Sequence, residues 1–129
     1  MGETIAERRE AGMELFREMV PTPPPGAEGQ APSQGTPFAP EIGNLAAENV
    51  FGALWTRPGL SRRDRSLVTI GILIALRAES ELRYHFPIAL RNGVTREELE
   101  EVIYQATGYA GFPAATAARN AAMEVLPKK

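Results

Sequence analysis

Apolar side chains recur along this chain at spacings of three and four residues, the pattern of helices with one buried face. No stretch alternates apolar and polar residues for long enough to predict a β-strand. Proline and glycine divide the helical pattern into separate segments. The helices expected from this pattern span residues 4–20, 41–55, 61–78, 80–92, 95–109 and 113–126. The pattern therefore predicts an all-α fold with about six helices.

The segment 61–78 is the most apolar of these helices. Its large apolar residues are Leu67, Val68, Ile70, Ile72, Leu73, Ile74 and Leu76. They fall on every side of a helix, and a helix that is hydrophobic all round is expected to be buried. Ser61, followed three residues later by Asp64, predicts a capped start whose acid favours the positive helix end. We expect the rest of the fold to be built around this helix.

The next helix, 80–92, carries the best candidates for chemistry. Ser80 suits the N-cap, and Gly93 suits the left-handed position just beyond the helix. His85, the only histidine, follows Glu81 by one helical turn. Pro87 removes an amide from the helix interior. It either kinks the helix and frees a carbonyl group, or ends the helix early so that it must restart.

The remaining helices are expected to bury one face each. The predicted inward residues are Ile5, Met13, Phe16 and Val20 in the first helix, Ile42, Leu45, Ala46, Val50 and Leu54 in the second, and Leu99, Val102, Ile103 and Ala106 in the fifth. Thr95 with Glu98 predicts a capping box, and Pro113 suits a first helical turn. The last helix is rich in alanine, which allows neighbouring helices to approach closely.

Residues 21–40 differ from the rest of the chain, with seven prolines and three glycines. We expect a loop or partly ordered arm, because irregular segments of this length in compact domains are usually functional or flexible. A Pro-rich ligand for another domain is the alternative. The length of 129 residues predicts a single domain, 1–129, that includes this arm.

The bulk composition excludes several classes of function. A net charge of −2 gives no broad attraction to nucleic acid or to a membrane surface. The absence of cysteine removes disulfides, thiolate metal sites and CxxC redox chemistry. The longest apolar run falls short of the roughly 20 residues of a membrane span, and no signal peptide is visible. We expect a cytoplasmic protein.

Several short motifs, in order and at consistent spacing, resemble the 4-carboxymuconolactone decarboxylase family. They are WTRPGL from Trp55, RSL from Arg65, the acidic stretch ending in Glu81 before His85, ALRNGVT from Ala89, YAGFPAA from Tyr109, and EAGM from Glu10. The resemblance covers residues 44–126 well. It implies an alkylhydroperoxidase-D-like helical bundle with intertwined subunits, assembled as a ring-like homo-oligomer, a hexamer or trimer, with no cofactor.

The family reaction is the loss of carbon dioxide from 4-carboxymuconolactone, a carboxylated unsaturated lactone, which gives an enol-lactone in the β-ketoadipate route of aromatic degradation. The related peroxidases use a CxxCxxxH motif. Their cysteine positions fall here at Ala78 and Glu81, so peroxidase chemistry is excluded. The resemblance therefore implies a carboxy-lyase that acts on a small lactone carboxylate without metal or cofactor.

Residue type, spacing and family together suggest a site. His85 is the proton donor or the partner of the developing oxyanion, and Glu81 orients the imidazole and favours its protonated form. Arg57 and Arg65 are the expected carboxylate-binding residues. Trp55 and Tyr109 are expected to supply an aromatic wall and a hydroxyl donor.

Two departures from the family pattern leave alternatives open. Pro87 stands where these decarboxylases commonly carry a basic residue, and 21–40 is richer in proline than the family segment. A related acid/base enzyme, such as an isomerase, dehydratase or cyclase, fits the same residues. So does a non-catalytic oligomeric scaffold, in which His85 is a hydrogen-bonded structural residue and Glu81 only a helix-surface partner.

Overall fold

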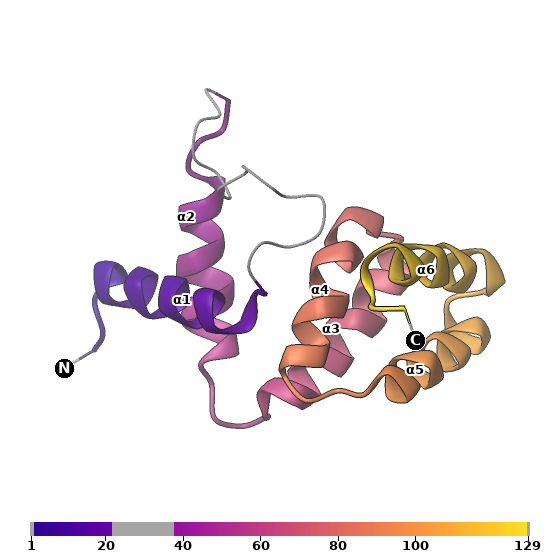
Figure 1. Cartoon of the computed structure of the whole chain (residues 1–129). Coiled ribbons are helices and arrows are strands. Elements are labelled where there is room, and N and C mark those ends of the chain that lie inside the picture. The colour runs from indigo at the N-terminus through magenta and orange to yellow at the C-terminus, as the bar shows by residue number, and fades with distance from the viewer. Residues whose placement is uncertain (1, 22–37, 129) are drawn as a thin grey trace. The chain divides into compact units, whose positions relative to one another are not determined.

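The computed structural model describes residues 2–21 and 38–128 of the chain (Figure 1). These residues form helices and no β-strand, which confirms the predicted all-α class. None of these helices combines the length and the apolar character needed to cross a membrane. The contacts divide the chain into two compact units, Met1–Gly59 and Leu60–Lys129. Residues 22–37, which include most of the predicted Pro-rich arm, lie outside the described part.

The first unit consists of α1 (Ile5–Met19), α2 (Ile42–Ala46) and η1 (Ala47–Trp55), a π-helix that continues α2. Helix α1 lies across η1 (Figure 1). Thr4 caps α1 by accepting a hydrogen bond from the backbone N–H of Glu7, and the Glu7 carboxylate accepts one from the backbone N–H of Thr4. This capping box fixes the start of the helix that crosses the π-helix.

Two glycines allow the backbones of α1 and η1 to touch. A Cβ atom on Gly12 would overlap the carbonyl oxygen of Ala47, and a Cβ atom on Gly52 would overlap the carbonyl oxygen of Arg8. Beside this crossing, Nε of Arg9 donates to Oε1 of Glu48 at 2.6 Å. The absence of side chains at Gly12 and Gly52 therefore sets the distance between the two helices.

Aromatic rings fill the other end of the crossing. The rings of Phe16 and Phe51 meet edge to face, with centroids 4.9 Å apart, and Phe51 stacks on Trp55 with centroids 6.3 Å apart. Such pairs add a small specific stabilisation to the burial of the rings.

The predicted inward faces of the first unit are partly wrong. Ile42, Leu45, Val50 and Leu54 are exposed, whereas Ala47, Gly52 and Trp55 are buried. The reason is that close backbone approach selects the face with the smallest residues, so the larger aliphatic residues turn outward. In α1, Ile5 and Met13 are likewise exposed, and the buried residues are Gly12, Leu15 and Met19.

The second unit consists of α3 (Arg62–Leu76), α4 (Glu79–Arg91), α5 (Arg96–Tyr109) and α6 (Phe112–Val125). Its core contains Ile70, Ile74, Leu82, Phe86, Ala89, Val94, Leu99, Ile103, Ala114, Ala115, Ala118, Ala121 and Ala122. The alanines of α6 face α4 and α5, so the predicted close approach of neighbouring helices occurs within this unit. As predicted, Leu99 and Ile103 of α5 point inward.

Most helix ends in the second unit agree with the sequence predictions. Ser61 accepts from the N–H of Asp64, Thr95 and Glu98 form a capping box, and Gly93 has φ 99°. Pro113 lies in the first turn of α6.

The start of α4 differs from the prediction. Arg77, with φ 56°, is the C-cap of α3, and only Arg77 and Ala78 separate the two helices, so the predicted N-cap Ser80 already lies inside α4. Helix α4 continues through the buried Pro87 to Arg91 without ending and restarting.

The prediction that α3 is buried on all sides is wrong. Ser66, Ile70 and Ile74 are buried, but Val68, Ile72 and Leu76 are 53%, 53% and 70% exposed. Helices α4, α5 and α6 pack on α3 from one side, so its other apolar side faces outward.

Substituting Gly12 by Ala should weaken the first unit. The added Cβ would displace the backbone of η1, and overpacking of this kind costs about 1–3 kcal/mol. Gly108→Ala is the matched control, because a Cβ there meets nothing within 4 Å. The fluorescence of Trp55, the only tryptophan, reports unfolding of this unit during urea titration. Equal midpoints for Gly12→Ala and the wild type would contradict the backbone contact.

Candidate functional site

The candidate site is centred on His85 in the middle of α4. The core residues Leu82, Phe86 and Ala89 hold this helix against the rest of the second unit. His85 lies beside this anchored face and is only 9% exposed. Buried histidine is uncommon enough to need an explanation, because its ring carries polar atoms at both nitrogens.

Burial sets the charge state of the imidazole. It lowers the pKa of His85 from 6.5 to about 4, because a desolvated ring favours the neutral form. This is opposite to the direction expected from a neighbouring carboxylate at Glu81. Glu81 lies one turn earlier on the same helix, as predicted, and is exposed to solvent. His85 is therefore neutral in the free protein at neutral pH.

A polar contact that the sequence analysis missed orients this part of α4. Nδ2 of Asn92 donates to Oγ of Ser66 at 3.0 Å, and Ser66 is almost completely buried. Asn92 lies seven residues after His85, or about two helical turns. His85 and Asn92 therefore lie on the same side of α4. The sequence contains one indication of this contact, because Ser66 lies on the same helix face as the apolar Ile70 and Ile74 and is therefore expected to be buried.

Arg65 lies next to Ser66 in the first half of α3 and is half-buried, with its Nε atom shielded from solvent. Because Ser66 contacts Asn92, Arg65 lies near the C-terminal end of α4. That end is about 10 Å along the helix axis from His85 at 1.5 Å per residue. The structure thus places Arg65 on α3, a helix that packs against α4, about two helical turns from the level of His85.

Trp55 and Arg57 belong to the first unit. Trp55 is the last residue of η1, and its buried ring stacks on Phe51. Arg57 is exposed in the turn after η1, where its backbone N–H donates to the carbonyl oxygen of Leu54 at 3.1 Å. Trp55 therefore has a packing function in its own unit, independent of any substrate.

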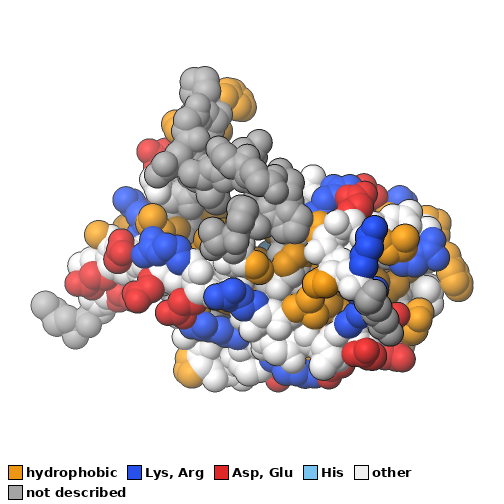
Figure 2. Space-filling view, in the orientation of Figure 1, with side chains coloured by type: hydrophobic (Ala, Val, Ile, Leu, Met, Phe, Trp, Pro, Cys, Tyr) orange, Lys and Arg blue, Asp and Glu red, His pale blue; other side chains and the backbone are white. Residues whose placement is uncertain are grey.

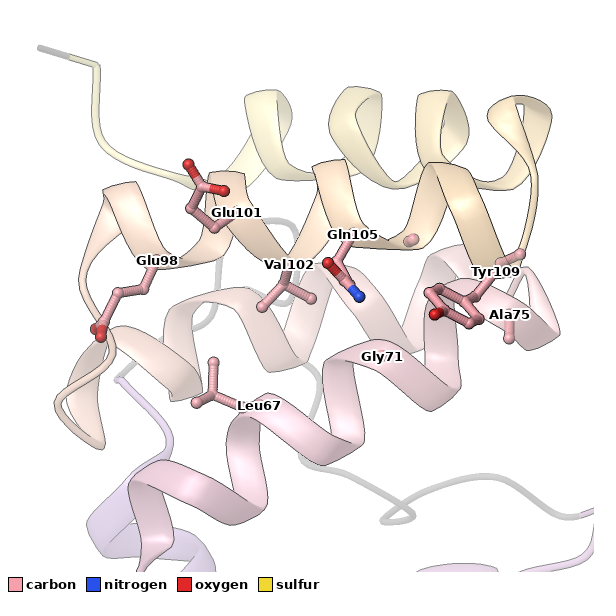
Figure 3. A pocket seen from close by; sticks show the side chains of 10 residues that line it. Leu67, Gly71, Ala75, Glu98, Glu101, Val102, Gln105 and Tyr109 are labelled. Carbon is pink, nitrogen blue, oxygen red and sulfur yellow. The ribbon is translucent and has the colours of Figure 1, made fainter.

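Tyr109 lies at the end of α5 and is 89% exposed. It contributes to a largely apolar groove of about 540 Å³ between α3 and α5 (Figure 3). We call this the α3–α5 groove; it is lined by Leu67, Gly71, Ala75, Glu98, Glu101, Val102, Gln105, Ala106, Tyr109 and Ala110. Figure 3 shows Tyr109 near Ala75 at one end and Glu98 at the other. The structure therefore places Tyr109 in a groove that His85 does not line.

A second, more polar hollow of about 390 Å³ lies between the start of α4 and α6. Its lining includes Arg77, Asn120, and the ion pair in which Nε of Arg83 lies 2.6 Å from Oε2 of Glu124. The Glu124 carboxylate raises the pKa of Arg83. Among the residues described, no three His, Asp or Glu side chains come together in a way that could hold a metal ion.

The buried imidazole predicts a pH dependence of stability. In the unfolded chain His85 binds a proton below about pH 6.5, whereas the folded protein resists protonation until about pH 4. The free energy of unfolding should therefore fall between these pH values, by about 3 kcal/mol in all, and the loss should stop below pH 4. Urea unfolding of the wild type and His85→Gln between pH 7 and 4 isolates this contribution.

Proton NMR provides an independent check, because His85 gives the only imidazole signals in the chain. A titration midpoint above pH 6 would contradict the buried neutral ring.

Comparison with known proteins adds to this geometry. A protein of Acinetobacter baylyi named 4-carboxymuconolactone decarboxylase is 47% identical over 89 residues, which cover 69% of this chain and 66% of that relative. A nitrosuccinic acid decarboxylase of Metarhizium robertsii is 42% identical over 78 residues, or 60% of this chain and 54% of that relative. An uncharacterized 15.0 kDa protein of Paracoccus denitrificans is 36% identical over 94 residues, or 71% and 70% of the two chains.

The matched part of this chain spans less than two thirds of each of the two named decarboxylases. The model of the carboxymuconolactone decarboxylase family matches residues 40–124. This range contains α2, η1 and nearly all of α3–α6, and with them every candidate site residue. The chain therefore belongs to the carboxymuconolactone decarboxylase family.

Proposed function

We propose that this protein is a carboxy-lyase that removes carbon dioxide from a carboxylated unsaturated lactone of the 4-carboxymuconolactone type. The observation that carries the proposal is the buried, neutral imidazole of His85 on α4, in a chain of this family. The identity of 47% to a relative named 4-carboxymuconolactone decarboxylase supports this substrate class. The product would be the 3-oxoadipate enol-lactone of the β-ketoadipate route, formed in the cytoplasm.

The reaction requires an electron sink, a hydrogen-bond donor and a proton. The bond from the ring carbon to the carboxylate breaks, and its electron pair moves through the unsaturated ring onto the lactone carbonyl oxygen. A proton added to a ring carbon then gives the enol-lactone, while carbon dioxide leaves. The lactone carbonyl is itself the electron sink, so this proposal needs no cofactor.

His85 would donate a hydrogen bond to the oxygen on which negative charge develops. Such a donor is most effective in a poorly solvated place, where few water molecules compete for the charge. Substrate carboxylates that bind nearby would also raise the pKa of the imidazole from its low value. His85 could then supply the proton that the ring carbon takes up after carbon dioxide has left.

The other candidate residues would bind and orient the substrate. Glu81, one turn before His85, would orient the imidazole, and Arg57 and Arg65 would bind the two carboxylates. Trp55 would form an aromatic wall and Tyr109 would supply a hydroxyl donor. We further propose that the whole chain functions as one domain in a homo-oligomer, a hexamer or trimer with intertwined subunits and sites near subunit contacts.

A second substrate class is favoured by the relative named nitrosuccinic acid decarboxylase. In a nitro-substituted acid, the nitro group takes the electron pair that the lactone carbonyl takes above. The demands on the protein are similar: bind carboxylates, donate a hydrogen bond to the sink and return a proton to carbon. The same residues could therefore serve either compound, and the size of the bound anion would decide between them.

Carbon dioxide release from 4-carboxymuconolactone and from nitrosuccinic acid tests the proposal. The wild type should decarboxylate the lactone, and His85→Ala should lower kcat by about 100-fold or more, the usual contribution of a general acid. Glu81→Gln should lower it less. Met123→Ala, an exposed position on α6, is the matched control and should retain wild-type turnover.

The outcomes separate the alternatives. If only nitrosuccinic acid released carbon dioxide, the substrate would be a nitro-substituted acid and not a carboxylated lactone. If neither compound released carbon dioxide, the isomerase, dehydratase, cyclase and scaffold alternatives would remain. If His85→Ala and Glu81→Gln both turned over the lactone at wild-type rates, the assigned site would be wrong.

A further inference from the structure

A hollow in the second unit, away from His85, has the features of a binding site. It is the polar hollow of about 390 Å³ between the start of α4 and α6, which we call the α4–α6 hollow. Its polar lining residues are Arg77, Glu79, Arg83, Thr116, Asn120 and Glu124. Small-molecule sites begin at about 300 Å³, so the α4–α6 hollow suits a compact ligand.

Helix α6 supplies neutral polar groups and open space. Its lining residues recur every three or four positions, so one face of the helix borders the hollow. Thr116 and Asn120 lie on this face, and a hydroxyl group and an amide can each donate and accept hydrogen bonds. Ala117 and Ala121 on the same face carry only methyl groups. The short side chains leave room for a ligand beside the two polar ones.

One pair of charges in the hollow is already balanced. Nε of Arg83 lies 2.6 Å from Oε2 of Glu124, and the hydrogen bond to this carboxylate raises the pKa of Arg83. Figure 2 shows basic and acidic side chains close to one another at several places on the face of the second unit in view. Arg83 and Glu124 therefore favour neither an anion nor a cation in the hollow.

Two further charges in the hollow are not balanced in this way. Within the described part of the chain, the side chains of Arg77 and Glu79 make no hydrogen bond or ion pair, with each other or with another residue. The charge of Glu79 acts on Arg83 through space and contributes to its raised pKa. A hollow that presents one such cation and one such anion is complementary to a ligand that carries both charges.

The backbone of Arg77 gives a second reason to assign a function to its side chain. Arg77 has φ 56° and ψ 39°, and its N–H donates to the carbonyl oxygen of Ile74 at the end of α3. Glycine is the usual residue in this left-handed conformation, because any Cβ atom is disfavoured there. A non-glycine residue in such a conformation is a sign of a functional constraint. Contact of the guanidinium with a ligand would provide that constraint.

We propose that the α4–α6 hollow binds a free amino acid with an amide side chain, such as glutamine. The planar guanidinium of Arg77 donates to the two carboxylate oxygens of the ligand, and the ligand ammonium group donates to Glu79. The side-chain amide exchanges hydrogen bonds with Thr116 and Asn120. A simple anion would be repelled by Glu79, and a simple cation by Arg77. Because His85 does not line this hollow, the inference is independent of the proposed decarboxylation.

Titration of the full chain with L-glutamine, followed by proton–nitrogen NMR, tests the proposal. The backbone amide signals of Thr116 and Asn120 should shift saturably. Two analogues separate the contributions of the charges: glutaramate lacks the ammonium group, and L-glutamine amide lacks the carboxylate. Each should bind at least about 10-fold more weakly than glutamine, because each loses a charge-assisted hydrogen bond.

Substitutions in the hollow test the same contacts from the side of the protein. Arg77→Gly removes the guanidinium but suits the left-handed backbone, so the variant should remain folded. Arg77→Gly and Glu79→Gln should each weaken glutamine binding by about 10-fold or more. Arg119→Ala removes an exposed guanidinium on α6 that does not line the hollow, and it should bind glutamine as the wild type does. Circular dichroism verifies the helicity of each variant.

Four results would overturn the proposal. Glutamine would cause no saturable shift at Thr116 and Asn120, or its shifts would be centred on the imidazole of His85 instead. Glutaramate would bind as tightly as glutamine, which would indicate a site for simple anions. Finally, Arg77→Gly and Glu79→Gln would both retain wild-type affinity, which would place the bound amino acid elsewhere.

Discussion

Desolvation of one imidazole is the constraint on which the proposed chemistry depends. Helix α4 is anchored by Leu82, Phe86 and Ala89, and the packing of these residues removes His85 from water. The ring is consequently neutral, with a pKa of about 4. Neutral imidazole has one N–H donor and one acceptor nitrogen, and in a region of low dielectric its hydrogen bonds are stronger than in water. The packing of α4 thus holds the N–H donor of His85 in a poorly solvated position before a substrate binds.

The burial of His85 would also couple substrate binding to protonation of its imidazole ring. A substrate that carries carboxylates would bring negative charge close to the ring and favour its protonated form. The proton needed at carbon after carbon dioxide leaves would then be acquired as the substrate binds. This coupling of substrate binding to protonation of His85 would be the same whether a lactone carbonyl or a nitro group receives the electrons. It therefore accommodates both named decarboxylases to which this chain is similar.

The exposed aliphatic surfaces follow from the way the chain divides. Two units of about 60 and 70 residues each bury a smaller fraction of their surface than one larger domain would. In the first unit, the glycine-mediated contact uses the small-residue face of η1 and leaves Val50 and Leu54 outside. In the second, three helices cover one side of α3 and leave Ile72 exposed. Each unit therefore keeps apolar side chains at its own surface.

Local patterns in the sequence determined the helices and most of their ends. The capping residues Ser61 and Thr95, the left-handed Gly93 and the first-turn Pro113 act through hydrogen bonds and backbone angles within a few residues, so they can be recognised without tertiary structure. The placement of His85 and Glu81 one turn apart on one helix was predictable for the same reason.

Tertiary structure alone decided which face of each helix is buried. Periodicity identifies an apolar stripe but not the neighbour that covers it, and at the crossing of α1 and η1 backbone contact at Gly12 and Gly52 prevailed over the larger aliphatic side chains. The bond between Ser66 and Asn92 joins residues 26 positions apart, so no local pattern contains it. The charge of His85 was likewise decided by packing, because Glu81 is near in sequence but exposed, and the removal of water from the ring lowers its pKa.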